Sequence, residues 1–171
     1  LRSGDYWKLF ISGMMGIFIP SFLYATAQTR MDSSVAGILN TLTPIFTMIV
    51  GAMGFQQKFT GYAIGGIILG FAGTVLLSFS TGLDFGFNTF ALLIVLACIL
   101  YASNLNFIKF NIPALSAVAI TSVSLLLIGP FSFIYLFGFT DFTQKLQTTE
   151  GAWKAFGFIA LLGFMSTALA T

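Results

Sequence analysis

The stretch of sequence that decides the fold is SSVAGILNTLTPIFTMIVGAMGFQQKFTGYAIGG, residues 33–66. Its first part, residues 33–57, carries no charged side chain, and a helix of that length crosses the hydrocarbon core of a bilayer. At helical spacing one face of the segment consists of small, polar and helix-breaking residues, and the opposite face is apolar. The first face consists of Ser33, Gly37, Asn40, Pro44, Thr47 and Gly51. The segment therefore predicts a membrane helix with one face unlike a lipid-contacting surface.

The most unusual point on this face is the pair Asn40 and Pro44. Because proline has no backbone N–H, the carbonyl of Asn40 loses its usual helical partner beside the Asn40 side chain. In hydrocarbon such a group needs another protein group or water. Two interpretations stay open: the pair lines a solute cavity, or it forms a packing kink that a neighbouring helix caps. Hydrogen bonds between membrane helices contribute roughly 0.6–2 kcal/mol, which is enough for the second.

The composition of the whole chain agrees with a membrane protein. The chain has 171 residues, of which 57% are hydrophobic and 7% charged, whereas a soluble domain has about 25% charged residues. The charges leave six uncharged runs, and a spanning helix needs roughly 20 residues. These runs are 9–29, 33–57, 59–83, 85–108, 110–140 and 155–171. We predict an all-α polytopic transmembrane helix bundle. The last run reaches the chain end and the chain begins without Met, so we expect a fragment that lacks helices at both ends.

Several functional classes receive no support from the residue types present. The net charge of +2 is small and dispersed, so we expect no nucleic-acid partner. The sequence has no His and a single Cys, and no ionisable Asp, Glu, Lys or Arg lies within a predicted span. An intramembrane enzyme would need a nucleophile–base pair, metal ligands or paired acids. We therefore expect no enzyme activity, no metal and no cofactor.

Two further pairs are candidates for a substrate cavity. Pro20 removes the helical partner of the Gly16 carbonyl, one turn before Tyr24. Tyr101 and Asn104 follow Ala97 at i, i+4 and i+7 on one helical face. Packing between helices remains the alternative for each pair.

A glycine ladder in the third uncharged run predicts close helix packing, because small residues let helix backbones approach each other in lipid. Its members are Gly61, Gly65, Gly66, Gly70 and Gly73.

Two segments of the sequence are similar to each other. The segment WKLFISGMMGIFIPSFLYAT, from Trp7, is similar to WKAFGFIALLGFMSTALAT, from Trp153. The distribution of Lys and Arg places the starts of these two helices on opposite sides of the membrane, with the short loops favouring a cytoplasmic start for the first. Similar helices of opposite orientation are typical of an inverted repeat.

The stretch FLYATAQTRMDSSVAGILNTLTPIFTMIVGAMGFQQKFTGYAIGGIILGFAGTVLLS resembles the EamA family of the drug/metabolite transporter superfamily. The matching positions are Ala36, Leu42, Pro44, Phe46, the connection 57–60 and the glycine-rich segment 65–73. The family usually has Glu where this chain has Gln57. The resemblance implies ten helices in two inverted five-helix repeats, of which this chain holds the third to the eighth. Residues 1–80 would then belong to the first repeat, 81–88 to a linker and 89–171 to the second repeat. The family's eighth helix lies at the cavity, which adds Ser166 and Thr167 to the candidates.

These observations together predict a permease or exporter that moves a small organic metabolite by alternating access. The solute would be amino-acid-like or drug-like and not strongly charged, because the candidate residues are amides, hydroxyls and aromatics. The alternative is a structural or assembly membrane protein that transports nothing and whose glycines only pack helices. The expected partners are the solute and the lipid bilayer, with a homodimer left open. The expected location is the bacterial plasma (inner) membrane.

Overall fold

The computed structural model describes residues 3–80, 89–149 and 151–168, and the side chains of 3–4, 77–80 and 166–168 are not included. The predicted linker 81–88 lies outside the described residues. The chain divides into two compact units, Leu1–Ser116 and Ala117–Thr171. Throughout the described ranges the regular structure is helical, without β-strands, which confirms the predicted fold class. The first unit ends at Ser116, after the fourth apolar run. This boundary describes compactness, whereas the predicted boundary at 81–88 separates two repeats, so the repeat boundary stays a prediction.

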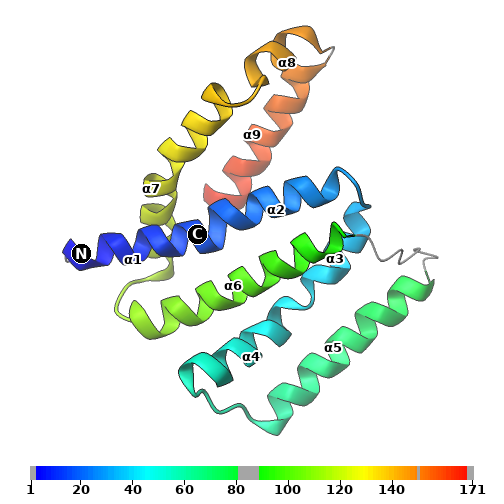
Figure 1. Ribbon diagram of the computed structural model, residues 1–171, viewed down its shortest axis with the longest axis vertical. Helices are drawn as coiled ribbons and strands as arrows, with labels where there is room; N and C mark the ends of the chain where they lie inside the picture. The colour runs from blue at the N-terminus through cyan, green and yellow to red at the C-terminus, as the bar shows by residue number, and fades with distance from the viewer. Residues whose placement is uncertain (1–2, 81–88, 150, 169–171) are drawn as a thin grey trace. The chain divides into compact units, whose positions relative to one another are not determined.

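In unit 1 the described helices are α1 (Ser3–Gly13), the π-helical turn η1 (Met14–Phe18), α2 (Ile19–Gln28), α3 (Ser33–Asn40), α4 (Thr43–Phe55), α5 (Gly61–Ser80) and α6 (Ala91–Asn111) (Figure 1). In unit 2 they are α7 (Ala117–Gly138), α8 (Phe142–Thr148) and α9 (Ala152–Ala168). The polar segment between α7 and α9 contains the short helix α8, which packs on both of its neighbours. Phe142 of α8 packs on Phe137 and Phe156 of the flanking helices at ring-centroid distances of 5.6 and 5.8 Å.

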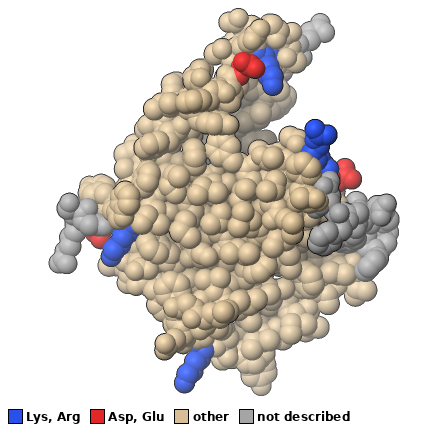
Figure 2. All heavy atoms as spheres, in the orientation of Figure 1, with Lys and Arg blue, Asp and Glu red and all other residues tan. Residues whose placement is uncertain are grey.

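Four stretches of the described residues are long and apolar enough to cross a membrane: Asp5–Gln28, Ser33–Phe55, Ala91–Asn111 and Ala117–Gly138. Two shorter apolar helical stretches, Gly61–Leu76 and Ala152–Met165, accompany them. On the face shown in Figure 2, Lys, Arg, Asp and Glu occupy a few small places and the rest of the described surface is uncharged. The chain is thus a multi-pass membrane protein.

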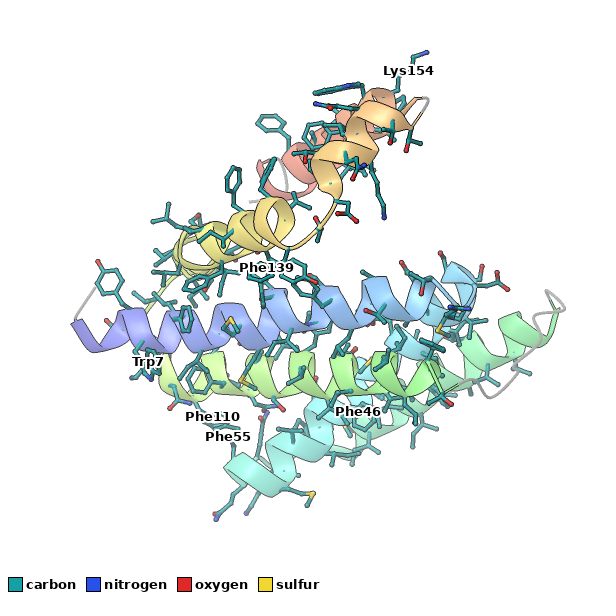
Figure 3. The ribbon with its side chains drawn as sticks, turned by 45° about the horizontal axis from the view of Figure 1, so that its top comes forward. Trp7, Phe46, Phe55, Phe110, Phe139 and Lys154 are labelled. Atoms are coloured by element: carbon teal, nitrogen blue, oxygen red, sulfur yellow. The ribbon has the colours of Figure 1, made fainter. Side chains whose placement is uncertain are left out.

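Helix α6 is the centre of unit 1, where it contacts α1, η1, α2, α3 and α4. It lies between α2 and α4 (Figure 1). Its contact face repeats every four residues as Ile94, Cys98, Ala102 and Asn106, all buried. Because Cys98 and Ala102 are small, the neighbouring backbones come close, as is usual for helix packing in lipid. The aromatic rings of Phe55 and Phe110 stack at 4.6 Å where α4 and α6 end (Figure 3).

Both prolines that were expected to interrupt helices do so. In the first span the N–H of Ile19 donates to the carbonyl of Met14, five residues back, so a π turn precedes Pro20. In the second span the expected single helix is two helices, because the chain turns at Thr41 and Leu42 and Pro44 lies in the first turn of α4. A proline is well tolerated there, since the first N–H groups of a helix have no intrahelical acceptor.

The glycine ladder of α5 has no packing partner within the described part of the chain. A Cβ atom built on any of its glycines would meet no heavy atom within 4 Å; these are Gly61, Gly65, Gly66, Gly70 and Gly73. The neighbouring Tyr62 and Leu69 are 95% and 74% exposed. The packing role of the ladder therefore stays a prediction, and close packing by small residues is instead observed on α6.

Candidate functional site

Unit 1 contains a cavity of about 720 Å³ at which η1, α2, α3, α4 and α6 meet. Its lining residues are Gly16, Tyr24, Asn40, Thr43, Pro44, Tyr101, Asn104 and Leu105. Five of the eight were candidates from the sequence, and they come from three different uncharged runs of the chain. The two backbone interruptions also border the cavity, because Gly16 lies within η1 and Asn40 and Thr43 flank the turn between α3 and α4.

One wall of the cavity is a small hydrogen-bonded network around the side-chain oxygen of Asn40. The hydroxyl of Tyr24 donates to this oxygen at 2.6 Å, and the hydroxyl of Thr43 donates to it at 3.1 Å. The network joins the first span to both halves of the broken second span. It therefore fixes the position of Asn40 where the helix is interrupted.

The network rests on a buried apolar cluster. Cys98 of α6 is fully buried with Ala27, Ala36 and Ile94. Its thiol lies 3.5 Å from the carbonyl oxygen of Leu39 and 3.9 Å from the hydroxyl of Tyr24. The packing of Cys98 therefore supports the part of the cavity wall formed by Tyr24 and Asn40.

A further part of the lining is Asn104 of α6, which lies against Gly16 of η1. A Cβ atom built on Gly16 would overlap Nδ2 of Asn104 and lie 2.9 Å from its Cγ, so any larger residue here would have to displace the Asn104 amide. The side-chain oxygen of Asn104 is shielded from solvent and has no hydrogen-bond partner among the described residues. A buried, unpaired acceptor of this kind is uncommon in proteins and raises the question of what donates to it.

Tyr101 completes the lining, one turn before Asn104 and Leu105. The rings of Tyr24 and Tyr101 are 6.2 Å apart, a distance at which aromatic side chains interact. The cavity thus has one aromatic corner and two polar walls.

A second cavity of about 400 Å³ adjoins the first and shares Thr43, Pro44 and Leu105 with it. Its remaining lining residues come from α4, the connection after it and α5: Thr47, Met48, Phe59, Ala63 and Ile67. Most of these side chains are apolar. The two neighbouring cavities therefore offer a polar and an apolar compartment side by side.

Asn106, only two residues beyond Asn104, has a different environment. It is buried, and its Nδ2 donates to the carbonyls of Thr47 (3.0 Å) and Ala102 (2.9 Å). It therefore joins α6 to α4 and has no part in the cavity.

Three of the predicted cavity residues are not among those that line it. Pro20 is buried and acts through the backbone, next to the π turn. Ser166 and Thr167 lie in α9 of unit 2, and their side chains are outside the described ones. Their role stays a prediction, as does the solute-binding role of all the lining residues.

Gly16, Thr43 and Leu105 were missed as lining residues. Gly16 shares a helical face with Pro20 and Tyr24, and Thr43 directly precedes Pro44, so both carried a signal in the sequence. Leu105 carried none, because nothing distinguishes it from other apolar residues of its span.

The lining residues set the chemistry of the cavity. Its amide, hydroxyl and phenol groups can donate and accept hydrogen bonds, and none of the eight lining side chains carries a full charge at neutral pH. Among the described residues, no group of three or more His, Cys, Asp or Glu lies together in a way that could hold a metal ion. The arrangement is suited to reversible binding of an uncharged polar molecule.

Comparison with known proteins agrees with the resemblance seen in the sequence. Residues 1–79 match the EamA-like transporter family. A protein of Archaeoglobus fulgidus described as an "Uncharacterized transporter" is 30% identical over 74 residues, which are 43% of this chain and 27% of that relative. The match thus covers about a quarter of the relative's length. No solved structure matches the chain. The similarity of this chain to the EamA-like transporter family is therefore confirmed over residues 1–79.

Proposed function

We propose that the chain is part of a membrane permease or exporter that binds a small, uncharged organic solute in the cavity of unit 1. The observation that carries the proposal is the convergence of Tyr24, Asn40, Pro44, Tyr101 and Asn104 on one cavity. Polar groups within membrane spans are costly to maintain, so their collection around one space favours a functional site over scattered packing contacts.

The solute class follows from the lining. An isolated charge in a site without a countercharge is strongly disfavoured, whereas amides and hydroxyls can replace the hydration of a neutral polar group. The adjoining apolar cavity beside Phe59 and Ile67 would accept an apolar tail. An amphipathic, amino-acid-like or drug-like metabolite of low charge fits both compartments.

The proposed mechanism is alternating access around this cavity. The π turn at Gly16 and the break after Asn40 both adjoin the binding space. Interrupted helices near the bilayer midplane are a common feature of transporter binding sites, where two repeats move against each other. We propose the plasma membrane as the location.

The test is solute counterflow in proteoliposomes that contain the natural full-length protein, with a panel of labelled neutral metabolites. Tyr24→Phe, Asn40→Ala and Asn104→Leu each remove one polar group from the wall. Because a neutral hydrogen bond contributes about 0.5–1.5 kcal/mol, each variant is expected to lower the rate at limiting solute about 2- to 10-fold.

The matched control is Asn111→Leu, which changes an exposed asparagine of α6 whose side chain bonds within its own helix, through Nδ2 to the carbonyl of Phe107. The Asn111 backbone carbonyl, which accepts from Lys8, is unchanged by the substitution. The control variant is expected to transport at the wild-type rate. Unchanged transport in all three wall variants would contradict the site. A wild-type protein that moves no solute of the panel would contradict the function.

A further inference from the structure

We propose that the cavity of unit 1 holds the polar end of its solute by a carbonyl oxygen, and that the side-chain nitrogen of Asn40 is the donor that binds this oxygen. The inference rests on the proposed function, and it adds the chemical group of the solute and the residue that recognises it. The class of ligand is a neutral carbonyl compound, such as a carboxamide, attached to an apolar or aromatic body.

The first observation is the orientation of the Asn40 amide. Its oxygen lies 2.6 Å from the hydroxyl of Tyr24, 3.1 Å from the hydroxyl of Thr43 and 3.9 Å from the thiol of Cys98. A distance of 2.6 Å is typical of an O–H···O bond and is short for a bond that involves an amide nitrogen. Three groups that can each donate a proton thus surround one atom, and the oxygen is the atom of the amide that accepts.

The second observation is the state of the Asn40 nitrogen. Asn40 is an exposed residue of the cavity lining, and its nitrogen has no hydrogen-bond partner among the described residues. Because the oxygen is used on the wall, the nitrogen is the polar atom that Asn40 offers to the contents of the cavity. An amide nitrogen carries two N–H donors and no acceptor, so it binds an oxygen and is poorly matched to another donor.

The groups beside this nitrogen suit a carboxamide in particular. The protons of the Tyr24 and Thr43 hydroxyls are used on Asn40, so their oxygens keep lone pairs. A carboxamide can therefore accept from Asn40 through its oxygen and donate to one of these hydroxyls through its nitrogen. The hydroxyl of Tyr101 also lines the cavity, is without a partner in the described part of the chain, and can act as a second donor.

The third observation is the absence of charge in the lining. At about 720 Å³ the cavity has room for a small aromatic carboxamide, and none of its lining side chains is an acid. Benzamide and the benzamidinium cation share this shape and differ at one position, where the carbonyl oxygen is replaced by a charged N–H₂ group. Opposite Asn40 the cation sets a donor against a donor and leaves its charge without a countercharge, which is unfavourable in an enclosed site.

The experiment measures saturable binding of labelled benzamide and labelled benzamidinium to the full-length protein in nanodiscs of zwitterionic lipid. The wild type is expected to bind benzamide at least about fivefold more tightly, the effect of one neutral hydrogen bond. Asn40→Asp keeps an oxygen for Tyr24 and Thr43 and replaces the nitrogen by a second oxygen. It is expected to weaken benzamide binding about fivefold and to strengthen benzamidinium binding about tenfold, because a carboxylate and an amidinium form a charge-assisted pair.

Two further variants separate the roles of the nitrogen and of the new charge. Asn40→Leu removes donor and acceptor together, so it should weaken benzamide binding about fivefold and gain no affinity for benzamidinium. Asn111→Asp introduces the same charge at an exposed residue of α6 outside the cavity lining, and it should keep both wild-type affinities.

Three results would overturn the inference: equal affinities for the two probes in the wild type, no saturable binding of either probe, or an unchanged benzamide affinity in the variants of Asn40. If Asn40→Asp does not fold, Asn40→Leu decides the point, and if neither folds, the wild-type comparison does.

Counterflow separates the two proposals. Transport by the wild type with no preference between the probes overturns only the role of Asn40. A preference for benzamide that reverses in Asn40→Asp, without transport of any solute, overturns only the permease.

Discussion

Asn104 and Asn106 lie two residues apart on α6, yet they have opposite environments. Asn106 is buried and donates to two carbonyls, one on its own helix and one on α4. Asn104 borders the cavity with an oxygen that has no partner in the described part of the chain. Two steps along an α-helix rotate a side chain by about 200°, so the two amides point to different neighbours.

The difference teaches how the same residue type takes two roles in one membrane helix. Opposite Asn106 stands Gly51 of α4, which leaves room for the amide, and the Asn106 Nδ2 donates to the carbonyl of Thr47 on the same helix. Opposite Asn104 stands Gly16 of η1, where the interrupted helix leaves an open space beside the contact. The environment across the contact, and not the residue type, separates the hydrogen-bonded amide of Asn106 from the unpaired amide oxygen of Asn104.

The largest expected effect is the loss of stability when the hydrogen-bonded amide of Asn106 is removed. Asn106→Leu removes two hydrogen bonds of a buried side chain, and the one to Thr47, which joins α6 to α4, is of a kind that contributes roughly 0.6–2 kcal/mol between membrane helices. We expect a loss of about 1–3 kcal/mol in the free energy of unfolding, measured by titration with SDS. Asn111→Leu, with its exposed and purely local bond, serves as control. A stability equal to that of the wild type would show that Asn106 does not hold α4 to α6.

A somewhat smaller effect is expected where Asn104 meets η1. Gly16→Ala would force the Asn104 amide out of its position, at a cost of about 1–2 kcal/mol that is typical of overpacking. The double variant Gly16→Ala/Asn104→Ala removes the clash, so its loss should be clearly less than the sum of the single losses. Additive losses in unfolding experiments would mean that the two residues are not in contact.

The next prediction compares two glycines that differ in what lies opposite. A Cβ on Gly51 would lie 2.9 Å from Oδ1 of Asn106, a side chain held by its two bonds, whereas a Cβ on Gly70 meets nothing. Gly70→Ala is expected to stabilise by up to about 1 kcal/mol through helix propensity. Gly51→Ala should lose that gain and be less stable than Gly70→Ala by about 1 kcal/mol or more. The reverse order in the same SDS titration would contradict the contact.

The smallest effect concerns the other wall of the cavity. Tyr24→Phe removes one hydroxyl, while the oxygen of Asn40 keeps its bond from Thr43. The expected loss of stability is about 0.6 kcal/mol, close to the average for such bonds in membranes. Solute binding should weaken more clearly than stability, and the reverse pattern would assign Tyr24 to the structural group with Asn106.

A large part of this site follows from reading the residues alone. Tyr24, Asn40, Tyr101 and Asn104 were picked out because each is an amide or phenol on a helical face that also carries a small or helix-breaking residue. The prolines also predict where a backbone is interrupted, since a missing N–H is a local property. The environments of Asn104 and Asn106 could not be predicted, because each depends on a glycine far away in the sequence.

The small residues also show that a sequence pattern does not determine which helices pack together. Gly61 to Gly73 of α5 form the more obvious ladder in the sequence, yet the observed close packing uses Cys98 and Ala102 of α6. Small size permits close approach but does not choose a partner.

The sequence by itself determined that the chain is built from apolar membrane helices, that two spans are interrupted at prolines, and which polar residues lie within the spans. These are local properties, set by the cost of charges and unpaired backbone groups in hydrocarbon. Only the tertiary structure decided that α6 is the centre of unit 1, that Gly16 and the π turn adjoin Asn104, and that one amide is satisfied while its neighbour two residues away is not. Those facts depend on which backbones meet, and that is fixed by packing over the whole unit.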